Sequence, residues 1–135
     1  MRKELEQKLV ERWPQWFDTE GDIRHTLMPW GFTHDDGWFD IVWRLCEDLE
    51  PLVAGHEFKV LQVKEKFGGL RFYVRFDGLR LSHADDANSR RIGAAMEESF
   101  HTCEVCGKPG ELREARWIRT LCDEHASGNG MPDRG

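Results

Sequence analysis

The chain has 135 residues, of which 39% are hydrophobic, and its eight Phe and six Trp are enough to build the core of about one domain. Its formal net charge of −6 excludes a uniformly basic surface, the kind that drives non-specific nucleic-acid binding. No apolar run approaches the roughly 18–20 residues that span a bilayer, and the amino-terminal residues lack the apolar segment of a signal peptide, so we expect a cytoplasmic protein with no membrane partner.

The charge is unevenly distributed along the chain. Residues 1–56 carry twelve acidic and six basic groups, whereas residues 57–81 carry three acidic and six basic groups. The acidic first half would suit a basic partner surface, including one that normally holds nucleic acid. The alternative is that the basic segment, residues 57–81, makes a local contact with nucleic acid.

The first helix is predicted over residues 3–13. Apolar side chains recur there at helical spacing from Leu5 to Trp13, and Pro14 marks the end. Residues 18–37 contain three glycines and a proline, which is typical of a long connection with at most a turn of helix.

A second helix is predicted after this connection. Asp35 or Asp36 can cap it, an apolar stripe from Trp38 to Leu49 forms its buried face, and Pro51 ends it. Cys46 lies in this stripe and is expected to be a small buried hydrophobic residue rather than a metal ligand or a nucleophile.

The period of the pattern changes to two between Phe58 and Phe76, which predicts strands. The adjacent glycines 68 and 69 separate two β-rich runs and favour a hairpin turn. A third helix is predicted over residues 83–101. We therefore expect an α+β fold for residues 1–102, with three helices packed on an antiparallel β-hairpin sheet.

The carboxy-terminal part contains two pairs of metal-binding residues. Cys103 and Cys106 are separated by two residues, as are Cys122 and His125, and fifteen residues lie between the pairs. This spacing predicts one structural zinc ion in a zinc-knuckle or treble-clef-like hairpin module over residues 103–126, packed on the first domain. Four protein ligands leave no open position for catalysis. His101 is an alternative to His125, and residues 127–135 are expected to form a disordered tail.

Two further groups of residues are candidates for chemistry or binding. Asp35, Asp36 and Asp40, with His34, are candidate ligands of a divalent metal in a hydrolase, although acids before a helix more often complement its dipole. Basic and aromatic residues on the two hairpins are candidates for contacts with phosphates or with an acidic protein: Lys64, Lys66, Arg71, Arg75, Arg113, Arg116, Trp117 and Arg119.

Residues 31–40, residues 62–73 (QVKEKFGGLRFY) and the two ligand pairs form an unusual combination of motifs. Together they resemble a family of small, largely uncharacterised zinc-knuckle proteins encoded by phages and prophages of bacteria. The resemblance covers roughly residues 30–126. It implies a phage origin, a location in the bacterial host cell and a zinc knuckle, but no particular activity.

The sequence from Cys103 to Pro109 and the closing Leu121-Cys122 pair also resemble the zinc frame of His-Asn-His and recombination endonucleases. Those enzymes carry an Asp-His or His-His catalytic pair between the two halves of the frame. Residues 107–121 contain no His, Asp or Asn, and their only acids are Glu111 and Glu114. The resemblance therefore implies a zinc-binding frame, but the catalytic residues that would activate water are missing between its two halves.

From these observations we expect a non-enzymatic, zinc-stabilised binding protein. Its expected partner is a host protein, which it would regulate or inhibit, for instance in host defence; this role follows from the resemblance and not from a site. The first alternative is a nucleic-acid-binding protein that uses the basic hairpin and the arginines of the zinc module. The second alternative is a metal-dependent hydrolase.

Overall fold

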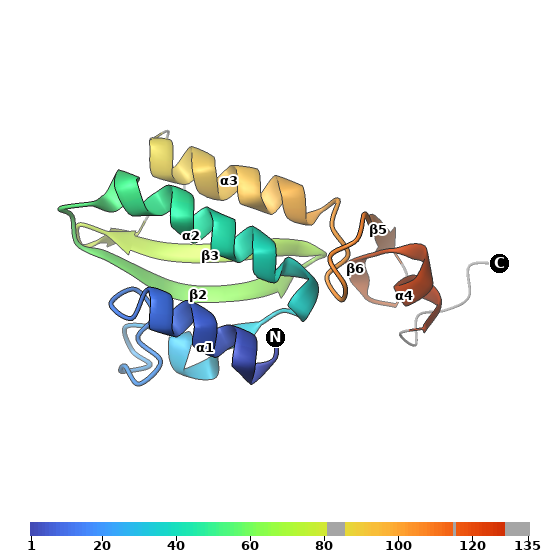
Figure 1. The fold of residues 1–135 in the computed structure, drawn as a ribbon, viewed down its shortest axis with the longest axis horizontal. Helices are drawn as coiled ribbons and strands as arrows, with labels where there is room; N and C mark the ends of the chain where they lie inside the picture. Colours follow the sequence, from blue (N-terminus) through green and yellow to red (C-terminus); the bar gives the residue numbers. More distant parts are fainter. Residues whose placement is uncertain (81–85, 115, 129–135) are drawn as a thin grey trace.

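The computed structural model describes residues 1–80, 86–114 and 116–128. Within these residues the fold is mixed α+β, with four α-helices, two 3₁₀ helices and two sheets (Figure 1). In chain order the elements are α1 (Lys3–Arg12), η1 (Met28–Trp30), β1 (Phe32–Thr33), η2 (Asp36–Trp38), α2 (Phe39–Val53), β2 (Phe58–Lys66), β3 (Gly69–Phe76), β4 (Leu79–Arg80), α3 (Ala87–Ser99), β5 (Glu111–Glu114), β6 (Ile118–Leu121) and α4 (Asp123–Gly128).

The larger sheet has four strands in the order β1-β2-β3-β4. The expected antiparallel hairpin, β2 and β3, forms its centre, whereas β1 pairs with β2 in parallel and β4 adds to β3. The two-residue strands β1 and β4 were not predicted, because such short segments carry no periodicity. No helix in the described part of the chain is long and apolar enough to cross a membrane.

A β-bulge at Leu61 determines which side chains of β2 share a face. Val60 pairs with Val74 and Gln62 pairs with Tyr73, so Leu61 has no partner on β3. The extra residue shifts the alternation of β2 by one position. As a result Phe58 and Val60 before the bulge and Val63 after it all lie opposite apolar residues of β3, on one face of the sheet.

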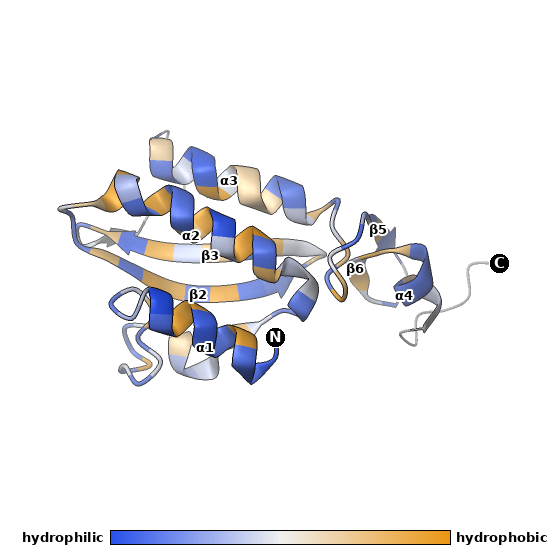
Figure 2. Ribbon diagram, in the orientation of Figure 1, coloured by the Kyte–Doolittle hydropathy of each residue, from blue (hydrophilic) through white to orange (hydrophobic). Residues whose placement is uncertain are grey.

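That apolar face and the buried stripe of α2 form the main core. Leu70, Phe72 and Val74 of β3 are buried, as the sequence pattern predicts, together with residues of α2 from Ile41 to Val53. Figure 2 shows the corresponding alternation of hydrophobic and hydrophilic residues along α2, α3 and β2. Leu9 of helix α1 and Trp13, the residue that follows the helix, join this core.

Helix α3 lies beside α2 and closes the edge of β3. The Oγ of Ser99 accepts a hydrogen bond from the backbone N–H of Leu70 at 2.8 Å. Because β4 pairs with β3 only at Arg75 and Phe76, α3 provides the acceptor for this N–H of β3. Asp86 caps the helix by accepting from the N–H of Ser89. The helix was predicted to start at residue 83, which lies outside the described residues.

Two predicted boundaries of α2 are wrong. Pro51 lies inside the helix, which continues to Val53. A proline so close to the end removes a single hydrogen bond, and burial of Val53 in the core compensates. Neither Asp35 nor Asp36 caps α2; its N-cap is Trp38, which makes no side-chain cap, and the 3₁₀ helix η2 leads into it.

Strands β5 and β6 and helix α4 form a small module at one end of the molecule, beyond the turn between β2 and β3 (Figure 1). Its own core contains Cys103, Leu121, Cys122 and Ala126. The predicted tail begins too early, because α4 includes Ser127 and Gly128. The rest of that tail, residues 129–135, lies outside the described residues.

Candidate metal centre and adjoining basic sheet face

The first ligand pair lies in a tight turn that precedes β5. The N–H of Gly107 donates to the carbonyl of Cys103 at 2.9 Å, and the N–H of Cys103 donates to the carbonyl of Lys108 at 2.7 Å. Gly107 has a φ of +81°, a conformation that glycine adopts without strain. This fold of the backbone turns both thiols toward the same point.

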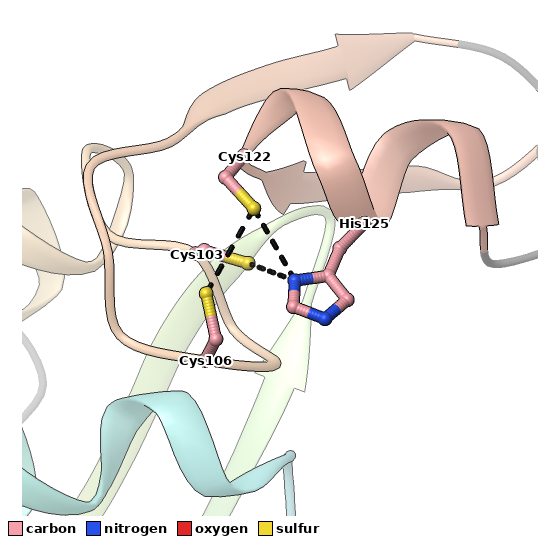
Figure 3. Close-up of side chains that lie close together, drawn as sticks. All are labelled: Cys103, Cys106, Cys122 and His125. Atoms are coloured by element: carbon pink, nitrogen blue, oxygen red, sulfur yellow. Dashed lines mark hydrogen bonds between the residues drawn. The ribbon is translucent and has the colours of Figure 1, made fainter.

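The second ligand pair lies at the junction of β6 and α4. Cys122 follows the last residue of β6, and His125 is in the first turn of α4. Residues three apart on a helical turn lie on the same side of it. The hairpin β5–β6 therefore carries Cys122 and His125 back to the turn that holds Cys103 and Cys106, as Figure 3 shows.

The four side chains converge closely enough to hold one metal ion. Their ligand atoms all lie within 4.8 Å of one another. The Sγ atoms of Cys106 and Cys122 are 3.8 Å apart, and Nδ1 of His125 lies 3.2 Å from Cys122 Sγ and 3.6 Å from Cys103 Sγ. Tetrahedral bonds of about 2.3 Å to sulfur and about 2.0 Å to nitrogen would separate the ligand atoms by roughly 3.5–3.8 Å. The cluster can hold a metal ion.

The protonation chemistry of the cluster also suits a metal. A backbone hydrogen bond from His125 lowers the pKa of the Cys122 thiol to about 7, so a thiolate is available near neutral pH. Desolvation acts in the opposite direction and raises the pKa of Cys106. Cys46 is fully buried in α2, far from these ligands in the fold, and burial raises the pKa of its thiol, in keeping with the expected inert role.

His125, and not His101, is the fourth member of the cluster. His101 is exposed, and its Nε2 lies 3.4 Å from a carboxylate oxygen of Glu97. The alternative ligand of the sequence analysis is thus placed outside the site.

Several buried contacts fix the metal module on the first domain. Glu104 is 4% exposed; its carboxylate accepts from the N–H of Asp35 at 3.0 Å, and its carbonyl accepts from the N–H of Gly37 at 2.6 Å. Burial raises the pKa of Glu104, an effect that Arg119, 3.4 Å away, opposes. Thr120 donates its hydroxyl to the carbonyl of Gly68 at 2.7 Å. Residues 35–38 and the β2–β3 turn therefore form the seat of the module.

Two of the three acids predicted as hydrolase ligands, Asp35 and Asp36, are engaged in this seat or in ion pairs around it, whereas the third, Asp40, is exposed in the first turn of α2. Asp35 pairs with Arg119 and Asp36 with Arg2, each at 2.7 Å. Nδ1 of His34 lies 2.8 Å from the carbonyl of Asp35, and its buried Nε2 has no hydrogen-bond partner among the residues that the structure describes. Among residues 1–80, 86–114 and 116–128, the cysteine–histidine cluster is the one group of three or more donors that converges on a point.

The second face of the large sheet gathers cations. The register places Lys59 opposite Arg75 and Lys64 opposite Arg71, while Tyr73 lies between these pairs, opposite Gln62. Lys66 follows on the same face, opposite Gly69. We call the five cations Lys59, Lys64, Lys66, Arg71 and Arg75 the basic sheet face.

These cations have no acidic partner within the described part of the chain. Lys59 donates to a backbone carbonyl, Arg71 contacts the sulfur of Met96, and Lys64 and Lys66 lie near aromatic rings. The Nε of Arg71 is buried and has no hydrogen-bond partner among these residues. Like charges directly across a strand pair destabilise a sheet, so this arrangement is unfavourable without an anion.

The structure separates the basic residues of the metal module into two groups. Arg113 bonds to the carbonyl of Leu121 and to Asp123, and Arg119 pairs with Asp35, so both hold the module together. Arg116 and Trp117 are exposed, with the guanidinium 5.6 Å from the ring centroid. Lys59 was not predicted as a member of this face, because strict alternation along β2 would place it on the opposite face from Lys64, and the bulge at Leu61 reverses this.

Comparisons with protein-family models, curated proteins and solved structures returned no match. The metal cluster and the basic sheet face are the two features of the chain that bear on its function.

Proposed function

We propose that this chain is a non-enzymatic, zinc-stabilised protein that binds nucleic acid through the basic sheet face. The observation that carries the proposal is the set of five cations on one sheet face, two pairs of them directly opposed, without an acidic partner among the described residues. Phosphates would relieve the repulsion between the opposed cations.

The exposed aromatic side chains near this face support a nucleic-acid ligand. Tyr73 is 39% exposed among the cations, and Phe67, beside Lys66 on the turn, is 63% exposed. Arg116 and Trp117 form a similar pair on the metal module. Interleaved cations and rings are the usual means by which proteins track a phosphate backbone and stack on bases.

The metal ion is proposed to be one zinc ion with a structural role, in a treble-clef-like module made of the knuckle, the β5–β6 hairpin and α4. Three cysteines and a histidine are the donor set of structural zinc sites. Because the four protein donors complete a tetrahedron, this site supplies no open position for substrate. The module would instead hold the β2–β3 turn and the cations beside it in place through the contact of Thr120 with Gly68.

The salt dependence of binding tests the proposal. A fluorescent oligonucleotide should bind with a log–log salt slope of about −0.7 per phosphate contact on a single strand. The double variant Lys64→Glu/Arg75→Glu should lose most of the affinity and reduce the magnitude of the slope by about 1.4. The control Lys3→Glu/Lys8→Glu changes the net charge equally on the exposed side of α1 and should leave the slope unchanged. Absence of binding at low salt, or an equal loss in both variants, would exclude the basic sheet face as the site.

A second candidate function, binding of a host protein, has its own observation. Helices α1 and α2 expose six acids that face away from the core: Glu4, Glu11, Asp40, Glu47, Asp48 and Glu50. A basic protein surface would complement them, in line with the regulatory role implied by the resemblance to phage proteins. Capture of one nuclease-resistant partner from a bacterial lysate, abolished by Asp40→Lys/Glu47→Lys but not by Lys64→Glu/Arg75→Glu, would support this function and would leave the sheet face without a role in it.

A further inference from the structure

A recess of about 300 Å³ opens beside Tyr73 on the sheet side that carries the cations. It lies between β2, β3 and the loop that precedes η1. The lining residues that could contact a ligand are Ile23, His25, Leu27, Gln62, Lys64 and Tyr73. The bulged residue Leu61 contributes to the lining as well. The volume is at the lower end of the roughly 300–1,000 Å³ of ligand pockets, which suits one flat heterocycle and not a stacked pair of bases.

The wall of the recess is held in place by hydrogen bonds to the bulge. The N–H of Leu27 donates to the carbonyl of Leu61 at 2.8 Å, and the hydroxyl of Thr26 lies 3.4 Å from the same oxygen. The N–H groups of His25 and Thr26 both donate to the carbonyl of Asp22, which closes the loop into a turn. The recess is therefore formed before any ligand arrives, and less ordering is required on binding.

The lining combines apolar contact with polar groups at the edge. Ile23 is 57% exposed and Leu27 is 38% exposed, although both are large and aliphatic. The ammonium of Lys64 lies over the Tyr73 ring, 5.9 Å from its centroid, and Tyr73 remains 39% exposed. Arg24 is paired with Asp22 through a two-point contact, which leaves Lys64 as the lysine or arginine of the lining that has no acidic partner among the described residues.

We propose that this recess takes one unstacked base of a single-stranded nucleic acid, stacked on Tyr73, while the flanking phosphates contact Lys64 and the rest of the basic sheet face. This inference rests on the proposed function and adds the class of ligand, because a duplex keeps its bases paired and could offer the recess only phosphates. Ile23 and Leu27 would contact the second side of the base, and Gln62 and His25 would face its polar edge.

The experiment measures the affinity of the full chain for three labelled probes of equal length, about 12 nucleotides, within the usual single-strand site size. The probes are a single strand, the corresponding duplex and a strand of abasic phosphodiester units. The single strand should bind most tightly. Tyr73→Ala should weaken only the single strand, by about 5–150-fold, the loss expected when one stacked base gives up roughly 1–3 kcal/mol. Tyr73→Phe should retain most of the affinity, because it keeps the ring.

A matched control is Trp30→Ala, which removes an exposed aromatic ring from a different recess beside α1 and should leave all three affinities unchanged. Ile23→Glu should weaken the single strand by placing a carboxylate at the rim. If the three probes bind the unmodified chain equally and Tyr73→Ala has no effect, the base recess is refuted while phosphate binding by the sheet face stands. If no probe binds at low salt, the proposed function fails as well. If polyglutamate competes equally well and Tyr73→Ala weakens it to the same degree, the occupant is an acidic protein segment and the inference is overturned.

Discussion

The indole Nε1 of Trp38 donates a hydrogen bond to the backbone carbonyl of Thr102 at 2.9 Å, joining the start of α2 to the residue before the first metal ligand. Trp38 is completely buried and belongs to the core of the first domain. The contact spans 64 positions of sequence, so it couples the folding of the core to the position of Cys103.

Replacement of Trp38 by Phe tests this coupling. Trp38→Phe keeps most of the apolar volume but leaves the carbonyl of Thr102 without its donor, so the free energy of unfolding should fall by roughly 2 kcal/mol. Urea denaturation of the metal-loaded protein measures the change. The affinity for metal should fall as well, since the knuckle loses a support. An unchanged metal affinity with reduced stability would restrict the role of Trp38 to the core.

Removal of the metal should unfold the module before the rest of the chain. Metal analysis should find one ion per chain, and Cys103→Ser or Cys122→Ser should abolish it. Because metal binding of this kind contributes on the order of 10 kcal/mol to folding, amides of residues 103–126 should lose hydrogen-exchange protection in chelator. His125→Ala should cost more than the roughly 10–100-fold in affinity that is typical of losing a hydrogen-bond partner of a ligand. His101→Ala is the matched control and should change neither metal content nor protection.

The buried His34, which precedes the seat in sequence, predicts a pH dependence of stability. Burial lowers the pKa of His34 from 6.5 to about 4. Between these values the unfolded chain binds the proton and the folded chain does not, so the free energy of unfolding should fall as the pH falls from about 6.5 to about 4, by roughly 3 kcal/mol. His34→Gln removes this contribution and keeps a donor for the carbonyl of Asp35. Since the metal ligands titrate in both proteins, the difference between the two stability curves isolates His34, and parallel curves would contradict the prediction.

Two glycine substitutions should act in opposite directions. A Cβ at Gly37 would lie 2.1 Å from the carbonyl oxygen of Cys103, so Gly37→Ala must displace the module and should cost about 3 kcal/mol or more. A Cβ at Gly93, inside α3, meets nothing within 4 Å, and Gly93→Ala should stabilise the protein by about 0.5–1 kcal/mol. Thermal unfolding of the two variants measures both effects. Equal destabilisation by both would mean that the seat around Gly37 is not tightly packed in solution.

The convergence of Cys103, Cys106, Cys122 and His125 was predictable from the sequence because its information is local. Two ligands separated by two residues define half a site wherever the chain carries them, and the hairpin between the halves has strong turn and strand signals. The central helices and the β2–β3 hairpin were predictable for the same reason, since their periods of 3.6 and 2 continue over many residues.

The features that the sequence did not reveal depend on contacts between distant residues. The bulge at Leu61 adds a single residue with no turn signal, yet it moves Lys59 to the same face as Lys64 and opens the recess beside Tyr73. The role of Glu104 as a buried link to Asp35 could not be inferred from its position between two cysteines. Pro51 was wrongly predicted to end α2. The helix continues to Val53 because Val53 is buried in the core, and this tertiary contact cannot be inferred from the local sequence.

The separation of acids on α1 and α2 from the cations of the sheet gives the molecule an electric dipole although its net charge is negative. At low ionic strength, where the Debye length is about 30 Å at 0.01 M salt, the negative net charge repels an approaching polyanion from afar. At 0.1–0.15 M salt the Debye length falls to about 8–10 Å, which screens this distant repulsion more than the attraction close to the sheet. Moderate salt should therefore speed association while it shortens the lifetime of the complex, whereas salt slows the association of a uniformly basic protein. Stopped-flow mixing at two salt concentrations separates the two rates, and an association rate that only falls with salt would mean that this dipole does not orient the encounter.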